Sequence, residues 1–350
     1  MQITFLLGNG FDIGLGLKTR YEDFYDEYSV ITEKDSEHIK KFKKMLKERD
    51  SKKEEKIIDW SDFEKAFGEY SNQFTLVEKQ MYIDCFEDFV TKFNSYLETE
   101  ESQIDYFDKQ LIGQTMRKAV ESYCNIREED TIKIRGVYEQ YEYANKWDYN
   151  FISFNYTKSV DECAAILKEV FKNDGNRDVG KVLHIHGYIE ENMIMGVNDS
   201  SQILNAELAN DNDIINEIIK PNQNREARTN YEGKVMEVIN KSNVICVYGM
   251  SLGETDKKWW KYISEWLTRN TYNTLIILTH QEKYNKRFPF SQRKVVEPII
   301  EKFLSFSELP EEKKEVIKKK IYIGVNNDVF EMELRNRSVE ELLELLSSGT

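Results

Sequence analysis

Hydrophobic positions along the chain gather into short apolar runs that each end in a polar cluster. Four segments show this pattern: ITFLLGNGFD (3–12), YNFISFNYTK (149–158), VLHIHG (182–187) and NVICVYGMSLGETD (243–256). Short apolar runs bounded by turn residues are typical of buried strands. Because open α/β sheets bind ligands at the carboxyl ends of their strands, the polar clusters predict one crevice of nucleotide size.

Strand-like and helix-like segments alternate after residue 150. Strands are predicted at 150–154, 182–186, 193–197, 243–248, 274–279 and 320–323, and helices at 157–171, 230–241, 256–268, 292–304, 311–319 and 338–347. The polar, asparagine-rich stretch 200–230 is interpreted as a mobile helix–loop segment over the site. This alternation favours an α/β, Rossmann-like fold with a mostly parallel sheet and helices on both faces.

The segment between the first strand and the alternating part has a different character. Residues 33–147 are rich in aromatic side chains, contain no proline and almost no glycine, and show apolar residues at helical spacing. Ser61 followed by Glu64 predicts a capping box at a helix start. A segment of about 110 residues is too long for a loop. We therefore predict a Rossmann-type domain of residues 1–32 and 148–350, and a helical insertion subdomain of residues 33–147.

Composition limits the class of protein. The 350 residues are 40% hydrophobic and 32% charged, which is typical of a globular protein with one large domain or two modest ones. No apolar run approaches the roughly 20 residues of a membrane span, and the N-terminus lacks the basic region of a signal peptide. The four cysteines are scattered, so we expect no disulfide framework and a reducing, cytoplasmic location. A net charge of −14 argues against nucleic acid as a partner.

The first polar cluster is a candidate phosphate cradle. It consists of Gly8, Asn9, Gly10, Phe11 and Asp12. Glycines let the backbone turn sharply against a pyrophosphate, although the third glycine falls at the wrong offset for a GxGxxG fingerprint. The alternative is a tight strand–helix turn with Asp12 as the helix N-cap. Arg20 is a candidate phosphate ligand, or else it pairs with Glu22 or Asp23.

Asn155 follows the second apolar run and precedes a helical pattern. Either Asn155 or Thr157 can cap that helix, and Thr157 is the better cap, which leaves Asn155 to face the crevice. A side-chain amide there can orient a water molecule and hold a ribose hydroxyl. Asn155 is therefore a candidate catalytic residue.

His184 and His186 alternate on one predicted strand and should point to the same face. His186 stands at the strand end before Gly187, where an imidazole suits general-base work. The alternative for each histidine is a satisfied core or surface residue. Because no third ligand stands at a recognisable spacing, no metal site is expected.

The last polar cluster supplies Gly249, Ser251 and Asp256 as candidate ligand contacts. Ser251 either caps the following helix or binds an adenosine ribose or phosphate. Like the first cluster, this one follows an apolar run directly, so we expect both at the same edge of the sheet.

The ordered motifs GNGFD, FISFNYT, HIHG and VYGMSLGETD resemble those of AbiH-type abortive-infection proteins, a branch of the SIR2-like (sirtuin-related) NAD-binding proteins. The resemblance spans most of the chain and is specific at residues 6–24 and at the asparagine and histidine motifs. It implies that Gly8 and Gly10 hold the NAD pyrophosphate. It also implies that Asn155 contacts the nicotinamide ribose and orients water, and that His186 acts as a base toward a ribose hydroxyl. The motif at 249–251 then contacts the adenosine side.

The chain departs from the sirtuin-like pattern in three places. Thr157 stands where an aspartate usually reads the nicotinamide amide, and Asp12 stands where a small serine is common. The four-cysteine zinc module of sirtuin deacylases is missing from the sequence. Protein deacetylase activity is therefore not expected.

The leading hypothesis is an antiphage NAD glycohydrolase, for which NAD is a substrate and not a recycled cofactor. A phage-derived or host protein is the expected trigger, and a homo-oligomer is the expected assembly. The alternative, favoured by Thr157, is a nucleotide-binding sensor that acts through a protein partner without turnover. A metal-dependent nuclease or phosphohydrolase would need clustered carboxylates, and no metal-spaced set stands out.

Overall fold

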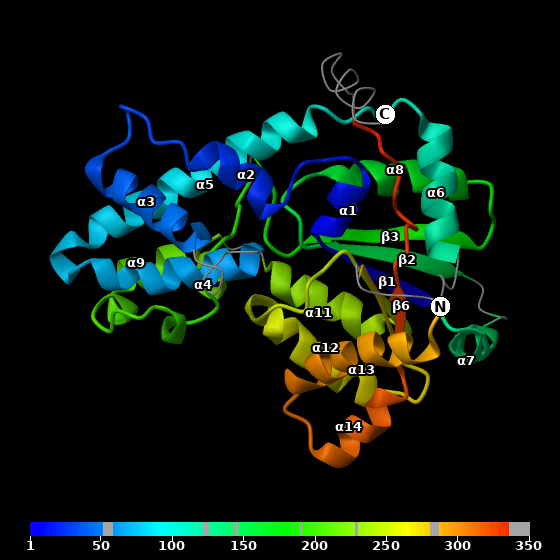
Figure 1. Ribbon diagram of the computed structural model, residues 1–350. Helices are drawn as coiled ribbons and strands as arrows, with labels where there is room; N and C mark the ends of the chain where they lie inside the picture. Colours follow the sequence, from blue (N-terminus) through cyan, green and yellow to red (C-terminus); the bar gives the residue numbers. More distant parts are fainter. Residues whose placement is uncertain are drawn as a thin grey trace.

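In the described part of the chain, six parallel strands form a central sheet (Figure 1). The computed structural model describes residues 1–51, 59–121, 126–141, 143, 146–189, 191–227, 230–280 and 287–335. The strands are β1 (Gln2–Leu7), β2 (Trp147–Ser153), β3 (Arg177–His184), β4 (Val244–Tyr248), β5 (Thr274–Thr279) and β6 (Ile321–Val325). Their order is β3-β2-β1-β4-β5-β6, that of a doubly wound sheet. From β1 the chain adds β2 and β3 on one side, and it then returns to add β4, β5 and β6 on the other side. The predicted α/β, Rossmann-like fold is confirmed.

The inner strands are buried on both faces, which explains their continuous apolar runs. In β1, Ile3, Phe5 and Leu7 point into one core and Leu6 points into the other. β1 pairs with β2 on one side and with β4 on the other. Its carboxyl end at Gly8 therefore opens where the chain changes direction across the sheet, the usual place for a ligand crevice.

Helices cover both faces of the sheet (Figure 1). One face carries α1 (Asn9–Gly14), α6 (Lys109–Glu121), α7 (Glu128–Glu139) and α8 (Ser159–Phe171). The other carries α11 (Tyr231–Lys241), α12 (Lys257–Arg269), α13 (Pro289–Ser305) and α14 (Glu311–Lys318). The helix predicted at 338–347 lies outside the described residues. No helix in the described ranges is long and apolar enough to cross a membrane.

A third core, rich in aromatic rings, lies beside the sheet. It contains α2 (Tyr21–Tyr28), α3 (Glu37–Ser51), α4 (Trp60–Tyr70) and α5 (Lys79–Glu101), which we call the helical subdomain. The short helices η1 (Ser71–Gln73) and η2 (Leu76–Glu78) join α4 to α5. Phe63 and Phe89 stack at its centre with ring centroids 3.9 Å apart. The later α6 and α7 also fall within 33–147, but they pack on the sheet.

Ile189 and the stretch 191–219 pack into the same aromatic core. This stretch forms η3 (Ser200–Gln202), η4 (Leu208–Asn210) and α9 (Asn212–Ile218), and α10 (Lys220–Glu226) follows directly. Ile214 and Ile218 are buried against the helical subdomain. This part of the chain is therefore a packed wall beside the sheet edge; the mobility expected for 200–230 stays a prediction.

The prediction of a strand at 193–197 is wrong. This stretch lies outside the sheet, and Val197 makes one isolated bridge to Ile219. Met195 and Val197 are buried in the core of the helical subdomain, so their apolar character reflects burial and not strand pairing. Gly196, with φ +132°, approaches α9 so closely that a Cβ would lie 2.1 Å from a carbonyl oxygen.

Two predicted helix caps are also wrong. At α4 the N-cap is Asp59, whose carboxylate accepts the Asp62 N–H at 3.0 Å, so Ser61 and Glu64 do not form the capping box. At α8 the first helical residue is Ser159, and Thr157 does not cap the helix. In both places the side chain expected to cap is placed instead in the pocket described below.

Candidate functional site

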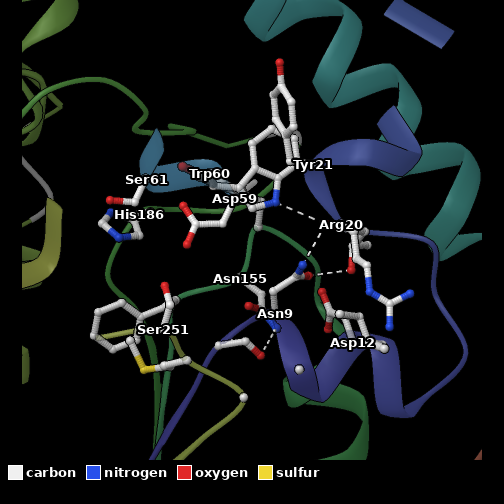
Figure 2. Close-up of a pocket in the computed structure, with 18 of the residues that line it drawn as sticks. Asn9, Asp12, Arg20, Tyr21, Asp59, Trp60, Ser61, Asn155, His186 and Ser251 are labelled. Carbon is white, nitrogen blue, oxygen red and sulfur yellow. Dashed lines mark hydrogen bonds between the residues drawn. The ribbon is translucent and has the colours of Figure 1, made fainter. Parts of the chain in front are cut away.

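A pocket of about 490 Å³ opens at the carboxyl ends of β1, β2, β4 and β5, next to the helical subdomain (Figure 2). Its volume lies within the roughly 300–1,000 Å³ of small-molecule sites. The sequence-predicted residues that line it are Gly8, Asn9, Gly10, Asp12, Arg20, Asn155, Thr157, His186, Gly249, Ser251 and Asp256. The ring of Phe11 is instead fully buried and packs edge-on against Phe330, with centroids 5.4 Å apart. The fold therefore brings segments far apart in the sequence to one cavity.

The two glycine turns touch each other. The N–H of Gly8 donates to Tyr248 at 3.0 Å, and that of Gly10 donates to Gly249 at 2.9 Å. A Cβ on Gly10 would lie 2.4 Å from the Gly249 Cα, and Gly249 itself has φ +67°. Glycine is therefore required at both positions by close backbone approach and, at Gly249, by backbone conformation.

Asn9 ties the first glycine turn to the helical subdomain. Its side-chain amide donates to the Thr19 carbonyl at 2.8 Å, and the Thr19 hydroxyl donates back to Asn9 Oδ1 at 2.5 Å. The same carbonyl accepts the indole N–H of Trp60 at 3.1 Å. Arg20, which follows Thr19, lines the pocket with an exposed side chain. Its backbone N–H donates to the Asp23 carboxylate at 2.9 Å.

Asp12 places a buried carboxyl group in the pocket wall. Its Oδ2 accepts from the Thr157 hydroxyl at 2.8 Å, and the Thr157 oxygen accepts from the Ser159 hydroxyl at 3.1 Å. Burial raises the pKa of Asp12 to about 7, although the hydrogen bond from Thr157 opposes the shift. The Thr157 hydroxyl is thus the hydrogen-bond donor to this carboxyl group. Asp12 itself lies inside α1 and is not the N-cap of that helix.

The glycine turn fixes the orientation of Asn155. The side-chain amide of Asn155 donates to the Gly8 carbonyl at 3.0 Å, and its backbone N–H donates to Ser153 Oγ at 3.1 Å. The residue is 6% exposed and lines the pocket. Because the nitrogen is the donor to Gly8, the amide oxygen is left to accept a hydrogen bond from a water molecule or a ligand hydroxyl.

His184 and His186 have different surroundings. β3 ends at His184, whose Nε2 lies 2.6 Å from the Asp161 carboxylate and whose Nδ1 lies 3.4 Å from the Asn155 carbonyl. His186 comes after the strand and lines the pocket, with Nε2 3.5 Å from Asp256 Oδ1. Of these two histidines, His186 is the one in a position to meet a ligand.

A buried ion pair stands in the same pocket wall. Lys220 Nζ lies 2.7 Å from the Glu64 carboxylate, and the two side chains are 8% and 5% exposed. Burial raises the pKa of Glu64, although the charge of Lys220 opposes this. Burial would also raise the pKa of Asp256, but the nearby His186 imidazole and the charge of Lys220 prevail and lower it. These four groups form a charge cluster that joins the helical subdomain to the sheet edge.

Sequence reasoning missed the part of the pocket that lies outside the strand ends. The helical subdomain and α10 contribute Asp59, Trp60, Ser61, Glu64 and Lys220. A signal for Glu64 was present, because this carboxylate falls on the apolar helical stripe of Trp60, Phe63 and Phe67. Lys220 has no comparable local signal, since its partner lies in a distant segment of the chain.

The sheet and the pocket define the class: a doubly wound α/β protein with a cavity at its topological switch point. The chain matches the family model described as bacteriophage abortive infection AbiH over residues 4–278, and it therefore belongs to the AbiH family. The matched range contains the glycine turns and the segments that carry Asn155 and His186. No curated protein matches the chain.

Proposed function

We propose that the protein is a SIR2-like NAD glycohydrolase that acts in abortive infection. Water replaces nicotinamide at the ribose carbon of NAD and gives ADP-ribose, nicotinamide and a proton. The observation that carries the proposal is the meeting of Asn155, His186 and the paired glycine turns in one pocket. Membership of the AbiH family supports the abortive-infection part.

The reaction asks the pocket to assist departure of a leaving group from a ribose ring. Positive charge develops on the ribose as the glycosidic bond breaks, and ionised carboxylates in the wall, such as Asp256, favour that charge. The amide oxygen of Asn155 holds the attacking water, and His186 holds or deprotonates a ribose hydroxyl. The resemblance to sirtuin-like enzymes assigns the pyrophosphate to the Gly8–Gly10 turn, which lines the pocket.

A nucleotide sensor that acts through a protein partner is the second candidate. The observation that favours it is the hydrogen bond from Thr157 to Asp12, which engages the side chain at the position where sirtuin-like enzymes read the nicotinamide amide. In either case we propose a phage-derived or host protein as the trigger and a homo-oligomer as the assembly.

The test is incubation of the purified protein with NAD, with nicotinamide and ADP-ribose followed by chromatography. We expect both products from the wild type and a loss of at least about 100-fold in Asn155→Ala and His186→Ala, as for removal of a positioned acid–base group. His38→Ala is the matched control, because His38 lies in α3 and pairs with Asp84 at 3.4 Å.

The outcomes separate the two candidates. Product formation that survives both substitutions would contradict the assigned roles. Saturable NAD binding without any nicotinamide release, in the presence and absence of a phage lysate, would favour the sensor.

A further inference from the structure

Trp60 is the first residue of α4 and belongs to the pocket wall contributed by the helical subdomain. Its indole N–H donates to the Thr19 carbonyl, which also accepts from Asn9. Its ring packs on Phe93, with centroids 4.3 Å apart, and meets Tyr21 edge-on at 5.4 Å and 82°. The indole is therefore held in a fixed orientation while it remains partly exposed where it lines the pocket.

A carboxylate belongs to the same part of the pocket wall. Asp59 directly precedes Trp60 and also lines the pocket, and its Oδ1 accepts the Asp62 N–H at the start of α4. Figure 2 shows Asp59 and Trp60 next to each other in the pocket, with Asn9 and Asn155 below them in this view. Because α4 begins here, the sequence Asp-Trp brings a negative charge and an aromatic face to the same part of the cavity.

An aromatic face next to a carboxylate favours a planar cation over a neutral ring. The electron-rich face of an indole attracts a cation, and tryptophan is the best side chain for this contact. The neighbouring carboxylate adds a charge–charge attraction that is stronger in a partly buried site than in water. A neutral ring of the same shape keeps the stacking contact but loses both electrostatic attractions.

We propose that Trp60 and Asp59 form the specificity-determining binding site, which we call the seat, for the positively charged pyridinium ring of NAD. This inference rests on the proposed function, since it names the part of the pocket that holds the leaving group. Nicotinamide becomes neutral when the glycosidic bond breaks, so the seat holds the substrate ring more tightly than the product ring. The contact exists before the bond breaks, and it therefore contributes to substrate affinity and to product release, not to the rate of bond cleavage.

The experiment compares two ligands that differ at this ring. The first is the carbocyclic analogue of NAD, in which carbon replaces the ribose ring oxygen, so the cationic ring is not released by hydrolysis. The second is the reduced form of the same analogue, whose ring is neutral. Calorimetric titration of the full chain should show the cationic form binding roughly 5- to 30-fold more tightly, the range expected for one well-placed cation–aromatic contact.

The variants test each half of the seat. Trp60→Leu should bring the two affinities to within about 2-fold, and Trp60→Phe should keep part of the preference, because phenylalanine retains an aromatic face. Asp59→Asn should lower the preference without disturbing α4, since asparagine is an equally good N-cap. Trp147→Phe is the matched control: Trp147 lies at the amino end of β2, opposite the pocket edge, and should leave the preference unchanged.

Tryptophan emission gives a second reading. Ligand should quench the emission of the wild type and of Trp147→Phe, and most of this quenching should vanish in Trp60→Phe. Circular dichroism checks the fold of each variant, and Asp59→Asn and Trp60→Phe carry the test if Trp60→Leu does not fold.

Three results would overturn the inference: equal affinity of the wild type for both ligands, an unchanged preference in Trp60→Leu, or no binding of either ligand. The measurement needs no turnover, so it can fail or succeed independently of hydrolysis. A preference for the cationic ring in a protein that releases no nicotinamide would support the seat and contradict the glycohydrolase.

Discussion

At the residue scale, Asp12 and Thr157 are neighbours, with 2.8 Å between their side-chain oxygens. In the sirtuin-like pattern on which the proposed function rests, the first position is often a serine and the second an aspartate. The chain thus keeps a hydroxyl and a carboxyl group in this part of the pocket but exchanges their positions. The two departures from the pattern are therefore one feature, a hydrogen-bonded pair whose carboxyl group comes from α1.

We expect protein stability to depend on pH through Asp12, whose pKa is raised from 3.8 to about 7 by burial. Between those values the folded state binds more protons than the unfolded state. The free energy of unfolding therefore falls as the pH rises through this window, and the contribution is lost above about pH 7. Asp12→Asn removes this dependence, which amounts to about 4 kcal/mol over the full window.

Urea denaturation of both proteins from about pH 4 to about pH 8 measures the difference. Asp26→Asn is the matched control, because Asp26 is an exposed aspartate on α2. Its substitution should change the free energy of unfolding by less than about 0.5 kcal/mol. Equal pH slopes for the wild type and Asp12→Asn would contradict the raised pKa.

Several site residues could be predicted at this scale because their positions depend on local sequence. Gly8, Gly10 and Asn155 follow apolar runs directly, and strand ends in a parallel sheet share one edge. The hydrogen-bond partners of these residues could not be predicted. The position of Thr157 in the sequence is typical of a helix cap. Its hydroxyl instead donates a hydrogen bond to the buried carboxyl group of Asp12, which lies in another segment of the chain.

At the element scale, α4 is a helix that connects the helical subdomain to the edge of the sheet. Asp59 and Trp60 stand at its start, and Glu64 follows one turn later on the same side. The Glu64–Lys220 ion pair fastens α4 to α10. One helix therefore supplies both an aromatic wall and a buried charge to the pocket.

Glu64→Gln should destabilise the protein by about 3–5 kcal/mol, because it leaves the Lys220 ammonium buried without its carboxylate. Adding Lys220→Met should recover part of the loss, since no unpaired charge then remains buried. Glu169→Gln is the control, because Glu169 pairs with Lys172 at 2.6 Å with both side chains about two-thirds exposed. This surface pair should contribute less than about 1 kcal/mol, and a similarly small effect for Glu64→Gln in thermal or urea denaturation would contradict the prediction.

Elements were predicted best where local pattern and burial agree. The inner strands β1, β4 and β5 are continuous apolar runs because both of their faces are covered. Five of the six strands fall where the alternating pattern after residue 150 indicates. The stretch 193–197 is equally apolar, yet it packs as a loop against the helical subdomain. Periodicity reports that a segment is buried, and only the packing partner determines whether it pairs as a strand.

At the scale of the whole molecule, the sheet and the helical subdomain meet at the pocket. The sheet edge contributes the glycine turns, Asn155 and His186, and the helical subdomain contributes Trp60 and Glu64. A ligand in this pocket contacts both parts. Displacement of the helical subdomain by a protein partner would alter the pocket directly, which gives the proposed trigger a physical route to the site.

Ligand binding should therefore protect both walls from hydrogen exchange. With the carbocyclic NAD analogue at saturation, amides in 8–12 and in 59–64 should exchange more slowly, because binding stabilises the folded state of the segments it contacts. Amides of α14, which lies away from the pocket, serve as the control and should change little. Protection confined to the sheet edge would contradict a pocket shared by the sheet and the helical subdomain.

The sequence by itself determined the α/β class, the parallel strands and the polar strand ends, because each of these depends on neighbouring residues along the chain. Only the tertiary structure decided that Asp12 meets Thr157, that Glu64 meets Lys220 and that Trp60 shares a carbonyl with Asn9. These contacts join side chains from distant segments. Their geometry depends on how the helical subdomain packs beside the sheet, and no local pattern of hydrophobic and polar residues records that arrangement.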